Sequence, residues 1–225
     1  GFWRDNKDII WHQGDKLLNI TTNKTVSMLD DSLQGIYQNS SALKITNAEP
    51  CSITDVKLFK KVIDTIYWKH DSHADLLLGW IALAPFCGLL DWRSHLWISA
   101  EHGGGKSDTA LYAISVGVGK EQCLRAKDST TEAGLRQTLK SDAKAVIVDE
   151  MEPNDAKDKA RIDRIISLAR NASSDDEATT LKGTISGSSM GFRIRSMFCC
   201  ASINTHLLGL ADQSRFTILD IDKKP

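Results

Sequence analysis

The sequence lacks several features that would assign it to a specialised class of protein. Its five cysteines are an odd number and show no CxxC or CxxH spacing, so neither a disulfide framework nor a zinc site is indicated, and a reducing compartment fits best. Neither sign of charge is in excess, because 28 Lys and Arg face 29 Asp and Glu. No global positive field therefore indicates a nucleic-acid partner, and any such contact must be local.

Long hydrophobic runs and repeats are also absent from the sequence. The most apolar stretch, Leu76 to Leu90, is too short to span a bilayer and contains Gly79, Pro85 and Gly88. The N-terminus has no signal-peptide layout. We therefore expect a cytoplasmic protein without a membrane partner, whose 225 residues fold around one sizeable core.

Three regions are expected along the chain. Residues 1–51 predict short strands and turns, as part of an upstream or collar domain, and both ends of the sequence resemble cut edges of a larger polypeptide. Residues 52–92 predict a helical region, with an amphipathic helix from Thr54 to near His70 and a helix over Leu76–Leu90 that is buried nearly all round and kinked at Pro85. Residues 93–225 form the main domain.

After Trp92, short apolar runs alternate with helical patterns, which is typical of an α/β fold with a mainly parallel sheet. The runs expected to be strands are 95–99, 123–126, 143–148, 197–203 and 216–221. Helices are expected over 106–117, 131–140 and 156–171. The six tryptophans fall mostly within apolar runs, so we expect them in the core rather than stacked on bases.

A phosphate-binding loop is indicated after the first of these strands, where residues 100–107 read A-E-H-G-G-G-K-S. In this pattern glycines let backbone N–H groups close around phosphates, the lysine reaches the β and γ phosphates, and the hydroxyl binds Mg²⁺. We therefore predict ATP and Mg²⁺ as cofactors. The predicted contacts are Gly103, Gly104, Gly105, Lys106, Ser107 and Asp108, with Ser107 also a metal ligand. Ala100 replaces the first glycine of the pattern, and the alternative is a glycine-rich turn without a ligand.

A pair of acids follows the apolar run 143–148. Asp149 stands at the carboxyl end of the expected strand, where it can hold Mg²⁺ through water or together with Ser107. Glu150 would polarise the attacking water. We expect this strand to lie next to the strand of the phosphate loop. The alternative is that both residues simply open an acidic loop, which continues through Glu152, Asp155 and Asp158.

Two further polar residues follow at positions that suit nucleotide hydrolysis. Asn204 ends the apolar run 199–203 and could orient the hydrolytic water, which is the layout of a sensor-1 residue. Arg215 introduces the last expected strand and could reach the γ phosphate of a neighbouring subunit as an arginine finger. An arginine acting in trans requires a head-to-tail interface, which closes into a ring or continues as a filament. The alternatives are a turn residue and a surface charge.

Residues 93–222 resemble the helicase module of phage and mobile-element primase-helicase proteins, which are AAA+ ATPases related to the superfamily 3 helicases. The matching phrases are T-T-E-A-G-L-R-Q at 130–137, V-D-E at 148–150, F-R-I-R-S-M-F at 192–198, S-I-N at 202–204 and D-Q-S-R-F at 212–216. The resemblance implies a P-loop AAA+ core of α/β class, preceded by a small, partly helical N-terminal region. It assigns catalytic roles to Glu150, Asn204 and Arg215, the last in trans, and phosphate and Mg²⁺ contacts to Lys106, Ser107 and Asp149.

The same resemblance implies a homo-oligomeric ring, usually a hexamer, that hydrolyses ATP and moves along single-stranded DNA in a bacterial host cytoplasm. Residues 178–195 predict a β-hairpin with a Gly and Ser tip. In superfamily 3 helicases a hairpin at this place lines the pore, so Lys182, Arg193 and Arg195 are the candidate DNA-binding residues. Alternatively, Arg193 and Arg195 pair with nearby acids or lie at the subunit interface.

The leading interpretation is therefore an ATP-hydrolysing DNA helicase or translocase module. Two alternatives keep the nucleotide site without translocation. One is an AAA+ loader or initiator, and the other is an assembly module whose oligomerisation is controlled by nucleotide.

Overall fold

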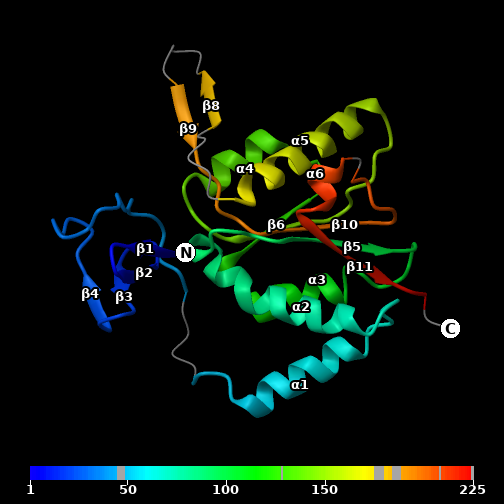
Figure 1. Ribbon diagram of the computed structural model, residues 1–225, viewed down its shortest axis with the longest axis horizontal. Helices are drawn as coiled ribbons and strands as arrows, with labels where there is room; N and C mark the ends of the chain where they lie inside the picture. The colour runs from blue at the N-terminus through cyan, green and yellow to red at the C-terminus, as the bar shows by residue number, and fades with distance from the viewer. Residues whose placement is uncertain (45–48, 128, 175–179, 184–188, 208, 224–225) are drawn as a thin grey trace.

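A five-stranded parallel sheet with helices on both faces forms the centre of the molecule (Figure 1). The structure is a computed structural model. It describes residues 1–44, 49–127, 129–174, 180–183, 189–207 and 209–223, with the backbone alone in 180–183 and 189–192.

The sheet contains all five strands that the apolar runs predict. They are β5 (His95–Ala100), β6 (Cys123–Ala126), β7 (Ala145–Val148), β10 (Phe198–Ser202) and β11 (Phe216–Ile221), in the spatial order β11-β5-β10-β7-β6. All four neighbouring pairs are parallel. The α/β class with a parallel sheet is therefore confirmed. The expectation that β7 lies next to β5 is wrong, because β10 is inserted between them, and hydrophobic periodicity carries no information about strand order.

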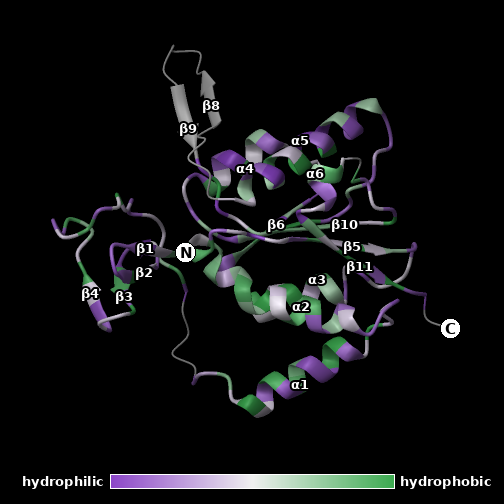
Figure 2. Ribbon diagram, viewed as in Figure 1, coloured by the Kyte–Doolittle hydropathy of each residue, from purple (hydrophilic) through white to green (hydrophobic). Residues whose placement is uncertain are grey.

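Alternate residues of the strands supply two layers of core. On one face, Leu96 and Ile98 of β5 pack with α2 (Ser72–Leu83) and α3 (Ala110–Val118). On the other face, Trp97 packs in the layer formed by α4 (Glu132–Leu139) and α5 (Ala156–Ala172). Because helices cover both faces, β7 and β10 are buried along their whole length. Figure 2 shows α2 hydrophobic along most of its length, whereas α1 and α5 alternate hydrophilic and hydrophobic residues.

The first helix is shorter than its predicted range of Thr54 to His70. It is α1 (Ile53–Asp64), and the segment after it turns toward β11. Trp68 forms a β-bridge with Ile221 at the edge of the sheet. This tertiary pairing replaces the last expected helical turns.

The second helix differs from the prediction at both ends and along its surface. α2 begins four residues before Leu76, and at Leu83, two residues before Pro85, it gives way to the 3₁₀ helix η1 (Ala84–Leu89), so the proline ends the α-helix instead of kinking it. The stretch is not buried all round, since Leu76 is 45% exposed. Within the described residues, Ser72–Leu89 is long and apolar enough to cross a membrane by length and composition alone. Its inner face packs in the core, and core helices of globular domains meet the same criterion.

The N-terminal segment forms the expected short strands. They are β1 (Phe2–Asp5), β2 (Asp8–His12), β3 (Leu17–Asn19) and β4 (Lys24–Val26), paired antiparallel in chain order. β1 packs against η1, where the rings of Phe2 and Phe86 are 4.8 Å apart. The assignment of residues 1–51 to an upstream or collar domain, and the boundaries at 52 and 93, stay predictions.

The predicted hairpin is present in the backbone. β8 (Thr180–Gly183) and β9 (Ser189–Phe192) pair antiparallel and extend beyond the layer of α4 and α5 (Figure 1). The described residues also form the short helices η2 (Lys120–Gln122) and α6 (Leu210–Gln213).

Candidate nucleotide site

The glycine loop leaves the carboxyl end of β5, and the loops after β7 and β10 lie at the same edge because these strands are parallel. Its three glycines are needed for two different reasons. Gly103 and Gly105 both have φ of +78°, in the left-handed region that side chains disfavour. Gly104 is closely packed, since a Cβ there would lie 3.0 Å from the carbonyl oxygen of Glu101 and 3.1 Å from the Cβ of Ala100.

The alanine that departs from the common pattern fits the loop. Ala100 is the last residue of β5 and pairs with Ile221 of β11 in the parallel register. An extended strand residue does not require glycine, so the phosphate loop begins only after this position.

The helix predicted over 106–117 begins four residues late, at Ala110. Thr109 has φ −115° and ψ −80°, outside the helical region. Its hydroxyl donates to the carbonyl oxygen of Gly105 (2.6 Å), which also accepts the N–H of Thr109 (3.0 Å). Both bonds span four residues, as in a single α-helical turn, but the N–H of Leu111 donates to the carbonyl oxygen of Lys106, five residues back (3.0 Å), so the regular helix starts only after this turn. Lys106 and Ser107 therefore lie in an irregular turn that precedes the helix.

The two predicted metal ligands meet across β10. The hydroxyl of Ser107 donates to Oδ2 of Asp149 at 2.7 Å, although 42 residues separate them. The other carboxylate oxygen accepts the N–H of Glu150 at 2.9 Å. A hydroxyl and a carboxylate oxygen are ligands that Mg²⁺ takes, together with water and phosphate oxygens. The residues present therefore fit the ion.

Glu150 has a strained backbone that no sequence pattern announced. Its φ is +58°, a conformation that costs a non-glycine residue about 1 to 2 kcal/mol. The strain is held in place from both sides, by the bond from its N–H to Asp149 and by Met151, which is fully buried and donates its N–H to Ala201 (2.9 Å). The result is an exposed carboxylate directly after the metal-ligand position.

Asn204 lies exposed on the loop that follows β10. Because β10 is the strand between β5 and β7, this loop starts between the glycine loop and the acid pair. The carbonyl oxygen of Asn204 accepts a hydrogen bond from the hydroxyl of Ser202.

Arg215 lies at the amino ends of the strands, whereas the glycine loop leaves their carboxyl ends. It directly precedes Phe216, the residue of β11 that pairs with His95 at the start of β5. The six-residue strand β5 separates this end of the sheet from the glycine loop by about 20 Å. Within its own chain, Arg215 donates to the hydroxyl of Ser173 (3.0 Å) and the carbonyl of Ala211 (2.7 Å), and its guanidinium lies 5.5 Å from the ring centre of Trp92. Trp92 is 51% exposed, so the expectation of a core position is wrong for this tryptophan.

The three candidate DNA-binding residues differ in what can be described. Lys182 pairs with Met190 across the hairpin, and its side chain lies outside the described part of the structure. Arg193 is exposed. The guanidinium of Arg195 stacks 5.6 Å from the ring centre of Trp3, on the N-terminal strand β1. Their contact with DNA stays a prediction.

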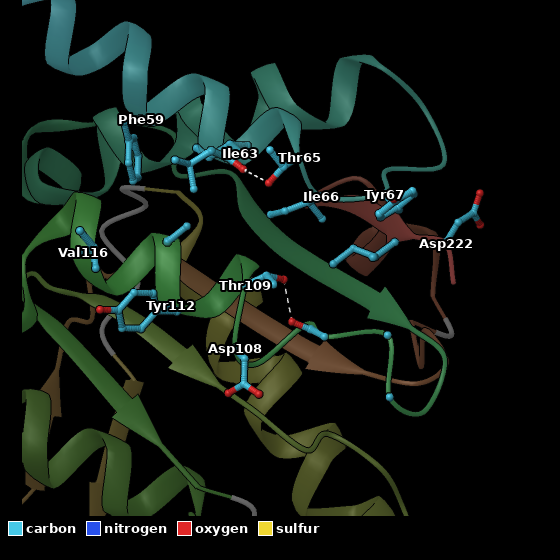
Figure 3. A pocket seen from close by; sticks show the side chains of 16 residues that line it. Phe59, Ile63, Thr65, Ile66, Tyr67, Asp108, Thr109, Tyr112, Val116 and Asp222 are labelled. Atoms are coloured by element: carbon cyan, nitrogen blue, oxygen red, sulfur yellow. Dashed lines mark hydrogen bonds between the residues drawn. The ribbon is translucent and has the colours of Figure 1, made fainter. Parts of the chain in front are cut away.

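An apolar pocket of about 530 Å³ adjoins the glycine loop, and the sequence analysis missed it (Figure 3). Phe59, Ile63 and Ile66, from α1 and the residues after it, form one wall, and Tyr112 and Val116 of α3 form the other. All three glycines of the loop lie at its border, with Asp108 and Thr109. The helical spacing at 54–67 placed its apolar residues on one face but gave no sign of unfilled space between two helices distant in sequence.

Comparisons with known proteins add little to this description. No known protein family matches the sequence, and no curated protein does. Among solved structures, the chain is similar to the RuvB Holliday junction branch migration motor of Thermotoga maritima, with a TM-score of 0.41 and 15% sequence identity. The match covers 77% of this chain and 47% of that one, so the chain spans less than half the length of RuvB. A TM-score and an identity this low carry no functional conclusion, and the α/β assignment rests on strand order and core layers.

Proposed function

We propose that this chain is the ATP-hydrolysing module of an AAA+ DNA helicase or translocase, active as a ring on single-stranded DNA. The observation that carries the hydrolase part is the 2.7 Å hydrogen bond from Ser107 to Asp149, which joins the glycine loop to the acid pair. An isolated glycine-rich turn has no reason to meet a strand-end carboxylate 42 residues away.

The residues of the site take distinct roles in this proposal. Lys106 and the backbone of the glycine loop bind the β and γ phosphates. Glu150 orients the attacking water, and Asn204 approaches the same water from the loop after β10. Mg²⁺ bound by Ser107 and Asp149 would neutralise charge that develops on the phosphate oxygens.

The apolar pocket is the place for the adenine ring. A flat aromatic base buries its faces well between apolar walls such as Phe59 and Val116, and binding sites of this size are mostly apolar. The phosphates then reach the glycines at the border of the same pocket.

Assembly into a ring is supported by the position of Arg215. It lies about 20 Å from the glycine loop of its own chain, so a role for Arg215 in hydrolysis requires a nucleotide held by another subunit. In such an assembly the Arg215 side of one subunit contacts the nucleotide site of the next. This is a head-to-tail interface, which can close into a ring.

Binding of single-stranded DNA is supported by local charge. From 178 to 198 the sequence contains Lys182, Arg193 and Arg195 and no acidic residue. Lys182 lies in β8 of the hairpin that extends beyond the helices (Figure 1), and the two arginines follow β9 on the segment that leads to β10. A basic group on a projecting element suits contacts with the phosphate backbone.

ATP turnover with and without single-stranded DNA tests this proposal. Glu150→Gln should bind ATP normally and hydrolyse it about 100-fold or more slowly, because the amide can neither orient the attacking water as a carboxylate does nor take its proton. Lys106→Ala should lose nucleotide binding, and Arg215→Ala should bind nucleotide but depress turnover in mixtures with wild type. Lys120→Ala, an exposed lysine on η2, is the matched control and should behave as wild type.

Two results would change the conclusion. Wild-type turnover by Glu150→Gln would refute the hydrolytic site. Turnover that DNA never stimulates, with or without charge-neutralising changes in the hairpin, would favour an AAA+ loader, an initiator or a nucleotide-controlled assembly module.

A further inference from the structure

One carboxylate holds both ends of the loop that carries Asn204. Oε1 of Glu152 accepts the backbone N–H of Ile203, directly before Asn204. Oε2 of the same side chain lies 3.2 Å from Nε2 of His206, two residues after Asn204. Glu152 therefore spans the segment in which Asn204 lies.

The inner side of this loop is tied to the sheet. The indole N–H of Trp97 donates to the hydroxyl of Ser202 at 2.6 Å, and that hydroxyl donates to the carbonyl oxygen of Asn204. Trp97 and Ser202 are both fully buried. Trp97 and Ser202 therefore hold the start of the loop against the sheet. Glu152 holds the loop from its solvent-facing side, through Ile203 and His206.

Glu152 is also rigidly connected to the acid pair. It follows Asp149 by three residues, and the intervening Met151 is fully buried and hydrogen-bonded to Ala201 of β10. The backbone at Glu152 is therefore held close to the acid pair. Its carboxylate contacts both sides of Asn204, so this one side chain links the acid pair to the loop of Asn204.

We propose that Glu152 is a positioning residue, which sets Asn204 relative to Asp149 and Glu150 during hydrolysis. This inference rests on the proposed function. A carboxylate has two acceptor oxygens and a negative charge, and hydrogen bonds to an ionised acceptor are about twice as strong as neutral ones. Glutamine in its place keeps the shape but loses the negative charge and one acceptor oxygen, so it can hold His206 only by donating to the other ring tautomer, and the bonds at both ends of the loop become weaker.

The test is a double-mutant cycle of Glu152→Gln and Asn204→Ala, with Glu121→Gln on η2 as the exposed control. Glu152→Gln should lower kcat about 10- to 100-fold, as expected for a displaced catalytic group, with the dissociation constant for ATP unchanged. The double variant should be no slower than Asn204→Ala alone, because Glu152 acts through that residue. Glu152→Asp, with a shorter reach, should give an intermediate kcat.

Amide hydrogen exchange provides a readout that needs no turnover. Exchange at Ile203 should rise in Glu152→Gln and stay at the wild-type rate in Glu121→Gln, while the melting temperatures remain equal. Unchanged exchange at Ile203, or losses of kcat that multiply in the double variant, would overturn the role of Glu152 while leaving the proposed function intact. Absence of hydrolysis in wild type would overturn both.

Discussion

A buried histidine makes the stability of this molecule depend on pH. Burial lowers the pKa of His95 to about 4, against the bond to the carbonyl of Ala169, which works to raise it. The ring uses both nitrogens in the neutral form: Nε2 donates to Ala169 (2.6 Å), and Nδ1 accepts the N–H of Phe198 (3.1 Å). Protonation would therefore remove the bond from Phe198.

The unfolded chain binds a proton at this histidine below pH 6.5, whereas the folded chain does so only near pH 4. The contribution of neutral His95 to the free energy of unfolding is therefore fully present above pH 6.5. As the pH falls toward 4, up to about 3 kcal/mol of this free energy is lost. Urea unfolding at pH 7.5, 6.0 and 5.0 should show this loss, and His95→Gln should flatten the slope. An equal slope in the variant would assign the pH dependence to other groups.

Single residues of the site were predictable where the chemistry is local. The sequence alone identified Ser107 and Asp149 as partners, because their residue types and strand-end positions suit one metal ion. It could not identify the strain at Glu150 or the bridge made by Glu152. Both depend on Met151 and on the loop after β10, which only the folded chain brings together.

At the scale of elements, Gly117 allows α3 to pack closely against α1 and α2. A Cβ at Gly117 of α3 would lie 2.5 Å from Cγ2 of Ile81 and 3.0 Å from the ring of Phe59, whereas one at Gly79 of α2 meets nothing within 4 Å. Gly79→Ala should stabilise the fold by about 0.5 to 1 kcal/mol through helix propensity. Gly117→Ala gains the same propensity but pays an overpacking cost of about 1 to 3 kcal/mol.

Chemical denaturation should therefore rank Gly79→Ala above wild type, and wild type at or above Gly117→Ala. Equal stabilisation by both changes would mean that Ile81 and Phe59 yield without cost. Since Phe59 also lines the apolar pocket, Gly117→Ala should weaken ATP binding as well.

Strands were easier to predict than helix ends. Each buried strand is a short apolar run, which the sequence displays directly. The end of α1 and the start of α3 were placed wrongly because they depend on the bridge from Trp68 to β11 and on the irregular turn at 106–109, where the N–H of Leu111 bonds five residues back to Lys106. These contacts leave no mark in hydrophobic periodicity.

At the scale of the whole molecule, the N-terminal sheet is attached to the main domain through a backbone contact. A Cβ at Gly88 of η1 would lie 2.2 Å from the carbonyl oxygen of Phe2 and 3.0 Å from the Cβ of Ala143. Gly88→Ala should push β1 away, lower the melting temperature and increase proteolysis within residues 1–26. Gly79→Ala is the control, and a wild-type cleavage pattern in Gly88→Ala would contradict this attachment.

The position of β5 has a consequence for how the chain is made. β5 pairs with β10 and β11, so that Leu96 meets Cys199 and His95 meets Phe216. At 5 to 20 residues per second, a ribosome needs roughly 5 to 20 s to travel that distance. During this interval the six residues of β5, which end up largely buried, have no strand beside them and are open to aggregation or to a chaperone. The glycine loop thus leaves the ribosome before β10 and β11, the two strands that support β5 on either side.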